Sequence, residues 1–157
     1  RQMCIRDSFA KAKDYYFDLD AVRIPYDAET KKARSRSIFV GAKWLELGYN
    51  PKDVWSVSRL HKEHRERADH PTQKPLEIVE RMLKASCPPG GVVLDPFMGS
   101  GTTAAAAIRC GRHYVGFELN AEYCELIEKR LQVLMSVDKP GTVTLRGNEL
   151  KPASEEI

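Results

Sequence analysis

The sequence predicts an α/β fold with a doubly wound parallel sheet, and two stretches of the chain carry that prediction. In residues 92–103 (V-V-L-D-P-F-M-G-S-G-T-T), a short aliphatic run ends at an aspartate, and a turn with two glycines follows. Residues 104–107 are all alanine, the strongest helix former. Residues 113–118 (H-Y-V-G-F-E) have the composition of a second strand. A buried strand, a helix and a second strand in this order form the crossover unit of a parallel sheet.

The first residues of the chain are expected to lie outside this fold. Residues 1–8 (R-Q-M-C-I-R-D-S) show no apolar period. Read back through the genetic code, they resemble a transposon end used in sequencing libraries, so we interpret them as a translated scar rather than a natural terminus. Residues 9–11 are expected to be the stump of a strand, as the family resemblance described below implies. Residues 15–17 (Y-Y-F) could stack on bases, but packing against the sheet edge is the favoured interpretation.

Positive charge is concentrated before the nucleotide-type fold. Residues 1–90 contain 18 Lys or Arg and 13 Asp or Glu, whereas residues 91–157 contain 7 and 9. The densest basic stretch, residues 28–36 (A-E-T-K-K-A-R-S-R), has few branched apolar residues and is predicted to be a loop or mobile segment. Such an excess suits contact with phosphates, although a solvated charge run is the default interpretation.

Cysteine spacing and hydropathy exclude two classes of protein. The four cysteines have no paired spacing, so neither a zinc site nor a disulfide framework is predicted, and no metal ligand is assigned. No apolar run approaches the roughly 18 residues of a membrane span. The chain is therefore expected to be soluble and cytoplasmic.

A predicted helix follows residues 70–75 (H-P-T-Q-K-P), after a short strand expected at residues 53–58. Thr72 is the expected N-cap, with Pro75 in the first turn. The apolar face of this helix would consist of Leu76, Ile78, Val79, Met82 and Leu83. A capped amphipathic helix explains the threonine and the second proline, but not the remaining polar residues of the hexapeptide.

The turn after the first strand is predicted to bind a ligand. Asp95 lies at the carboxyl end of its strand, where open α/β sheets bind ligands. Gly99 and Gly101 allow positive φ and leave no Cβ between the backbone and a ligand. Thr102 and Thr103 follow where their hydroxyls can bond the free N–H groups of the first helical turn. The turn lacks the third glycine of G-x-G-x-x-G and the Gly-Lys-Ser/Thr of a phosphate-binding loop.

Glu118 ends the second strand and suggests what the ligand is. It follows the glycine turn at close to the spacing of about 20 residues at which an acid binds ribose hydroxyls. A glycine turn and a ribose-binding acid without a phosphate-binding lysine suit a nucleoside that carries a carboxylate. S-adenosylmethionine is the candidate. The alternative is an ordinary crossover whose glycines bind nothing.

The last part of the chain is predicted to contain two helices and little else. The alanine-rich helix should run from Thr102 to near Gly111. A further helix should span residues 121–135 with Asn120 as its cap. Residues 143–145 are a candidate strand, and residues 151–157 are expected to be a disordered tail.

Five motifs in order along the chain resemble one enzyme family, the β-class of amino-methylating DNA methyltransferases. These enzymes methylate adenine N6 or cytosine N4. The matching stretches are residues 15–26 (Y-Y-F-D-L-D-A-V-R-I-P-Y), 50–55 (N-P-K-D-V-W), 70–75 (H-P-T-Q-K-P), 95–103 (D-P-F-M-G-S-G-T-T) and 116–124 (G-F-E-L-N-A-E-Y-C). The resemblance covers residues 9–131, which is most of the chain.

The resemblance implies a Rossmann-like class I methyltransferase fold, truncated at its amino end, and S-adenosylmethionine as cofactor. Residues 9–69 would be one part of the domain and residues 70–150 the cofactor-binding part. Asp95 would approach the methionine ammonium, Phe97 would wall the site, and Glu118 would bind the ribose. The implied cofactor-binding residues are His70, Thr72, Gln73, Lys74, Asp95, Phe97, Gly99, Ser100, Gly101, Thr102 and Glu118. The implied DNA contacts are Lys31, Lys32, Arg34 and Arg36.

The family's reaction also requires a motif that is absent from these residues. Its members flip the target base out of duplex DNA and hold the amine with a D/S/N-P-P-Y/F/W motif. The only Pro-Pro pair here follows Cys87 and precedes a glycine, so no catalytic residue is assigned. We expect a carboxyl-terminal part of the enzyme, inactive alone, in a monomer or homodimer. Adenine N6 is favoured because residues 70–75 resemble adenine-specific members; cytosine N4, a non-catalytic nucleotide-binding module and an RNA or protein methyltransferase are the alternatives.

Overall fold

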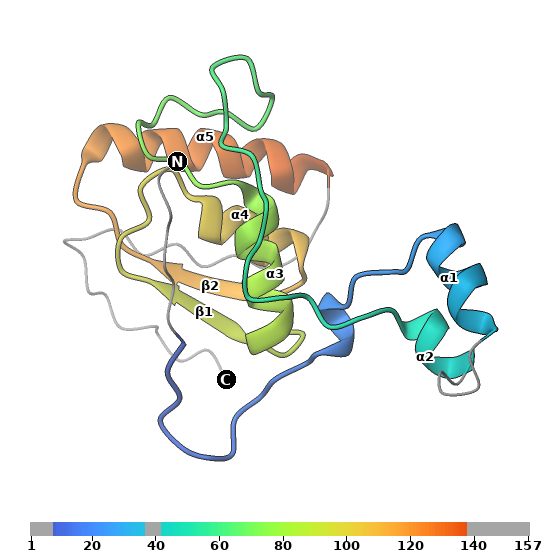
Figure 1. Cartoon of the computed structure of the whole chain (residues 1–157). Coiled ribbons are helices and arrows are strands. Elements are labelled where there is room, and N and C mark those ends of the chain that lie inside the picture. Colours follow the sequence, from blue (N-terminus) through green and yellow to red (C-terminus); the bar gives the residue numbers. More distant parts are fainter. Residues whose placement is uncertain (1–7, 37–41, 138–157) are drawn as a thin grey trace.

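The computed structural model describes residues 8–36 and 42–137, which form helices around a small parallel sheet (Figure 1). In chain order the elements are the 3-10 helix η1 (Asp20–Val22), α1 (Ala28–Ser35), α2 (Ala42–Leu47), α3 (Leu76–Ser86), β1 (Val92–Asp95), α4 (Thr102–Arg109), β2 (His113–Gly116) and α5 (Ala121–Val137). The predicted strand at 143–145 and tail at 151–157, like most of the suspected scar, lie outside the described residues.

The core lies where α4 crosses from β1 to β2. The two strands pair in parallel, with Val92 opposite His113 and Asp95 opposite Gly116. The four alanines of α4 are completely buried, because their small side chains let the helix backbone approach the sheet closely. Tyr114 from β2 and Ile127 and Leu131 from α5 complete this cluster with residues of α3. The strand–helix–strand unit confirms the predicted α/β class.

The strand β1 is only partly covered, and on one face, which corrects the expectation of a buried strand. Val93 packs against the core, but Val92 is 65% exposed and Leu94 is 63% exposed. Successive side chains of a strand point to opposite faces of the sheet. The described helices therefore cover the Val93 face and leave the other face of β1 uncovered.

Most of residues 28–36, predicted to be a loop or mobile segment, belong to the helix α1 (Ala28–Ser35). The side chain of Asp27 accepts hydrogen bonds from the backbone N–H and the hydroxyl of Thr30, both at 2.7 Å, and so caps α1. Alanine, glutamate, lysine and arginine are good helix formers even without an apolar face. The prediction was wrong because it weighed apolar periodicity above helix propensity and the cap.

Neither predicted strand in the first half of the chain forms. Residues 53–58 and 9–11 have no strand conformation, and in the described residues the pairing outside β1 and β2 is a single antiparallel bridge between Ile24 and Tyr49. Trp55 instead donates its ring N–H to the carbonyl of Lys52 at 2.6 Å and lies beneath the guanidinium of Arg81 in α3. A strand needs a neighbour to satisfy its backbone, and these segments have none among the described residues.

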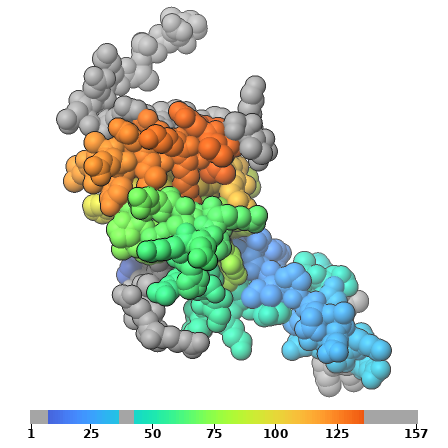
Figure 2. All heavy atoms as spheres, turned by 90° about the horizontal axis from the view of Figure 1, so that it is seen from above, coloured from blue at the N-terminus to red at the C-terminus, as the bar shows by residue number. Residues whose placement is uncertain are grey.

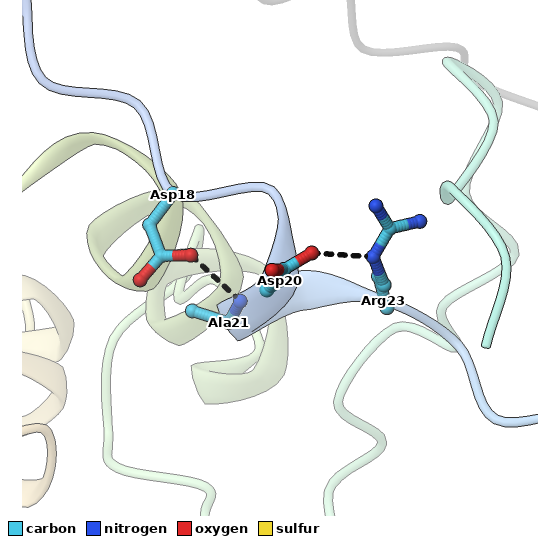
Figure 3. A network of polar contacts seen from close by, with 4 residues as sticks. All are labelled: Asp18, Asp20, Ala21 and Arg23. Atoms are coloured by element: carbon cyan, nitrogen blue, oxygen red, sulfur yellow. Dashed lines mark hydrogen bonds and ion pairs between the residues drawn. The ribbon is translucent and has the colours of Figure 1, made fainter. Parts of the chain in front are cut away.

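The segment around η1 connects α3 to the helical pair α1 and α2, which lies to one side of the sheet (Figure 1). Asp18 accepts the backbone N–H of Ala21 at 3.0 Å, and its own N–H donates to the carbonyl of Ala85 at the end of α3. Arg23 pairs with Asp20 at 2.6 Å (Figure 3). The Arg23 guanidinium also lies over the Trp44 ring of α2.

The helix caps differ from the prediction at α3 and agree with it at α5. Pro75, not Thr72, is the residue before α3, and the free N–H of Leu76 donates to the Glu66 carboxylate at 3.2 Å. At α5, the Asn120 side chain accepts the N–H of Glu122 at 2.9 Å, as predicted. No described helix is long and apolar enough to span a bilayer.

Candidate functional site

The candidate site lies at the carboxyl ends of β1 and β2. The ladder continues beyond both strands, because Phe117 N–H donates to the Asp95 carbonyl at 3.0 Å and Met98 N–H donates to the Phe117 carbonyl at 2.9 Å. Met98 is buried directly over Gly116, where an added Cβ would overlap the methionine sulfur. These contacts hold residues 96–101 beside residues 117–120.

Glu118 connects the glycine turn to the start of α5. Its Oε2 accepts the backbone N–H of Gly99 at 2.7 Å, and its Oε1 accepts the backbone N–H of Asn120 at 3.0 Å. A carboxylate offers about four acceptor positions, so these two bonds leave capacity for hydroxyl donors of a ligand. Sequence spacing placed Glu118 near the turn, and the structure brings the two into direct contact.

His70 packs over the same turn. A Cβ added to Gly99 would lie 3.1 Å from Nε2 of His70, and the imidazole ring lies 4.5 Å from the Tyr123 ring, centroid to centroid. Nδ1 accepts the backbone N–H of Thr72 at 3.2 Å. Burial lowers the pKa of His70, and the charge of Glu118 opposes this only in part. The neutral ring therefore carries its proton on Nε2.

The two glycines of the turn have different neighbours, and the expectation that both leave room for a ligand stays a prediction. Both have positive φ, 53° at Gly99 and 74° at Gly101. However, a Cβ on Gly101 would lie 3.0 Å from Cγ1 of Ile127 in α5. Gly101 is thus required by the packing of α5 on the turn, whereas Gly99 faces His70.

Arg130 of α5 forms hydrogen bonds to the glycine turn. The sequence analysis did not predict this role. Its Nη1 donates to the Ser100 carbonyl at 2.9 Å and to the Thr102 hydroxyl at 3.2 Å. Burial lowers the pKa of the guanidinium, opposed by the charge of Glu66. The sequence feature that could have predicted this role is the position of Arg130, a basic residue three positions after Ile127 on the apolar face of the predicted helix.

Thr102 does not cap α4 as predicted. The helix begins after Gly101 without a side-chain cap. The Thr102 hydroxyl lies 3.1 Å from the Ser100 hydroxyl and donates to the carbonyl of Lys74 at 3.4 Å. Its role is to connect the turn with the segment before α3.

Within residues 70–75, the side chains of Gln73 and Lys74 bond the protein itself. Gln73 is only 8% exposed; its Oε1 accepts the N–H of Ala68 and its Nε2 donates to the Glu66 carbonyl, both at 2.6 Å. The oxygen and the nitrogen of the Gln73 amide are therefore both hydrogen-bonded to the preceding loop. Lys74 is exposed and donates to the carbonyl of Thr72 at 2.9 Å.

Asp95 and Phe97 belong to the start of the turn, where β1 ends. Oδ1 of Asp95 accepts the backbone N–H of Phe97 at 3.0 Å, which fixes the start of the turn. The Phe97 side chain is 83% exposed, so it walls no enclosed site within the described residues. Those residues also contain no group of three or more His, Cys, Asp or Glu that could hold a metal ion.

Of the predicted DNA-binding residues, Lys31, Lys32 and Arg34 lie on α1 and Arg36 directly follows it, apart from this turn (Figure 1). Two of the four bond within the protein: Lys31 pairs with Glu46 at 3.1 Å, and Arg34 lies over the Tyr26 ring and donates to its hydroxyl. Neither of the other two, Lys32 and Arg36, bonds another described residue through its side chain.

Comparisons with known proteins point to one family. A family described as DNA methylase (N6_N4_Mtase) matches residues 8–129. The chain is 39% identical over 123 residues to the Type II methyltransferase M.ScaI of Streptomyces caespitosus, covering 76% of this chain and 39% of that protein. It is 40% identical over 126 residues to the DNA adenine methyltransferase YhdJ of Escherichia coli strain K12, covering 78% and 42%.

Among solved structures, the chain resembles the M1.HpyAVI–SAM complex, with 36% identity and a TM-score of 0.44 over 53% of this chain and 43% of that one. The chain spans about two fifths of the length of the curated relatives M.ScaI and YhdJ.

Proposed function

The chain belongs to the family of DNA methylases, and on that premise we propose that it binds S-adenosylmethionine and serves the methylation of adenine N6 in duplex DNA. The observation that carries the cofactor proposal is the contact between Glu118 and the N–H of Gly99. It places an acid with free acceptor capacity against a glycine turn at the carboxyl edge of a parallel sheet.

The residues of the turn fit an adenosine ligand better than a polyphosphate. Thr102 follows Gly101 where a phosphate-binding lysine would stand, so the turn carries no cation of its own. Glu118 would accept hydrogen bonds from the ribose hydroxyls, and Asp95 would accept a hydrogen bond from the ammonium group of the methionine part. His70, neutral and packed on Gly99, would shield the turn from water without adding charge. The bound cofactor would supply an activated methyl group on its sulfonium.

Adenine N6 is proposed as the acceptor because YhdJ, a DNA adenine methyltransferase, is 40% identical to this chain. Cytosine N4 is the second candidate. Methylated DNA, hydrolysed to nucleosides and separated by chromatography, would distinguish the two products. We propose that the enzyme flips its target base and acts in the cytoplasm. We also propose that it contacts DNA through Lys32 of α1 and through Arg36, which directly follows α1, among other groups.

We further propose that these 157 residues alone transfer no methyl group. Positioning the amine in line with the sulfonium supplies much of the rate of such a reaction. No Asp, Asn or Ser in the chain is followed by Pro-Pro, so the group that would hold the amine is not among these residues. Incubation with radiolabelled cofactor and mixed-sequence DNA tests this, and site-specific labelling by the chain alone would contradict it.

Cofactor binding is tested by calorimetric titration of S-adenosylmethionine into the chain and two variants. Glu118→Ala should weaken binding by about 1.5–3 kcal/mol, the range for a hydrogen bond to a charged group. Glu122→Ala is the matched control, because Glu122 is an exposed acid of the same surface without an ion pair to the described residues. A wild-type chain without measurable affinity, or equal affinity in both variants, would contradict the proposal.

A further inference from the structure

A basic cavity lies beside the segment that precedes α3, and Gln73 of that segment is part of its lining. It has a volume of about 380 Å³ and is lined by Arg59, Leu60, His61, Lys62, Arg67, Pro71 and Gln73. Three of these side chains are cations, a fourth is an imidazole, and none is an acid. The chain around residues 60–75, green in Figure 2, lies at the surface beside α5, in orange.

The three cations that line this cavity are not paired with acids within the described part of the chain. Arg59 and Lys62 form no ion pair there, and Arg67 reaches only the carbonyl of Leu60, at 3.5 Å. The nearest acid along the chain that is partly buried, Glu66, points its carboxylate at the N–H of Leu76 instead. Cations that lie close together without ion pairs repel each other, and a bound anion would relieve that repulsion.

The backbone that carries these cations is fixed before any ligand binds. Gln73 bonds both the Glu66 carbonyl and the Ala68 N–H, so it holds the residues on either side of Arg67. Two successive turns, His64 N–H to the His61 carbonyl at 3.0 Å and Arg67 N–H to the His64 carbonyl at 2.7 Å, shape the loop. A preorganised loop loses less conformational freedom on binding.

We propose that Arg59, His61, Lys62 and Arg67 form a phosphate site that binds a backbone phosphate of duplex DNA. Guanidinium groups bind phosphate oxygens through paired N–H bonds, and the cavity offers two of them with an ammonium group. The site continues directly into residues 70–75, whose His70 packs on the glycine turn. A phosphate held here would fix the duplex next to that turn. This inference rests on the proposed function.

The test is fluorescence anisotropy of a labelled mixed-sequence duplex, titrated at several salt concentrations. The triple variant Arg59→Ala, Lys62→Ala, Arg67→Ala should bind more weakly, with a log–log salt slope smaller by about 0.9 for each phosphate that is no longer bound. The control Lys11→Ala, Lys13→Ala, Lys129→Ala removes the same charge from exposed positions that do not line the cavity. Equal slopes in the two triple variants would overturn the inference.

Two further measurements separate the possible failures. If the wild-type chain binds neither S-adenosylmethionine nor DNA, the proposed function fails. The second case is a wild-type chain that binds both ligands. If the cavity variant then keeps its circular dichroism spectrum, its cofactor affinity and its DNA affinity, the proposed phosphate site is wrong and the proposed function stands. Calorimetry with inorganic phosphate covers the other source of this chemistry: saturable binding that is absent in the cavity variant, with unchanged DNA affinity, would assign the cavity to a free phosphate and overturn the DNA contact.

Discussion

Replacement of Gly101 by alanine should destabilise the fold through two separable effects. The first is backbone strain: Gly101 has a φ of 74°, and the left-handed region costs a residue with a Cβ about 1–2 kcal/mol. The second is overpacking, because the new Cβ would lie 3.0 Å and 3.1 Å from two side-chain carbons of Ile127. Extra methyl groups in a packed core cost about 1–3 kcal/mol. The expected total is about 2–5 kcal/mol.

Gly111 provides the matched control for this change. Its φ is 67°, but a Cβ there would meet nothing within 4 Å. Gly111→Ala should therefore cost only the strain, about 1–2 kcal/mol. Urea unfolding followed by circular dichroism gives both free energies of unfolding, and their difference isolates the contact with Ile127.

A double-mutant cycle with Ile127→Ala completes the experiment. This substitution removes both carbons that Gly101→Ala would crowd. The two changes together should cost less than the sum of their separate effects, with a coupling of about 0.5–3 kcal/mol. Equal losses in Gly101→Ala and Gly111→Ala, or strict additivity in the cycle, would refute the argument that the helix α5 requires glycine at this position.

Three further predictions concern the groups around the turn. Arg130→Met removes two hydrogen bonds to residues 100–102, so it should lower the free energy of unfolding by about 1.5–3 kcal/mol and weaken cofactor binding. Lys129→Met, at an exposed position, is the control and should change neither quantity. Urea unfolding measures the stability of each variant, and calorimetry measures its cofactor affinity. Because burial lowers the pKa of His70 below its unfolded value of about 6.5, its stabilising effect is complete above that pH and is lost as the pH falls toward the folded pKa. Urea midpoints measured between about pH 5 and pH 8 should fall on acidification, and less so in His70→Gln; parallel curves would contradict this. Gln73→Ala leaves the Ala68 N–H and the Glu66 carbonyl without their partner and should cost about 1–3 kcal/mol in the same assay; an unchanged free energy of unfolding would contradict this.

Local sequence signals were sufficient to predict the second half of the fold. The aliphatic run, the glycine turn, the alanines of α4 and the Asn120 cap each act within a few residues, so each can be read without tertiary information. The closeness of Glu118 to the turn was also predictable. The carboxyl ends of parallel strands meet at one edge of a sheet, and Glu118 and Gly99 follow two such ends.

Contacts between distant residues explain most of what the sequence did not predict. The cap of α3 is Glu66, ten positions before the helix starts, and local rules chose Thr72 instead. Residues 53–58 have strand composition, but strand formation depends on a paired neighbour. The helix α1 is the exception: its Asp27 cap and its helix-forming residues are local signals, so this error was avoidable.

The geometry of the candidate site is set by side chains outside the turn itself. Glu118 holds Gly99 from the end of β2, Arg130 holds Ser100 from α5, and Thr102 bonds back to the carbonyl of Lys74 before α3. Because bonds from three parts of the chain hold Gly99, Ser100 and Thr102, the cost of ordering the turn falls on folding and not on ligand binding. A substitution that loosens any one of these anchors should therefore weaken a ligand that it never touches. For that reason Arg130, which would meet no part of the cofactor, is expected to matter to its affinity as Glu118 does.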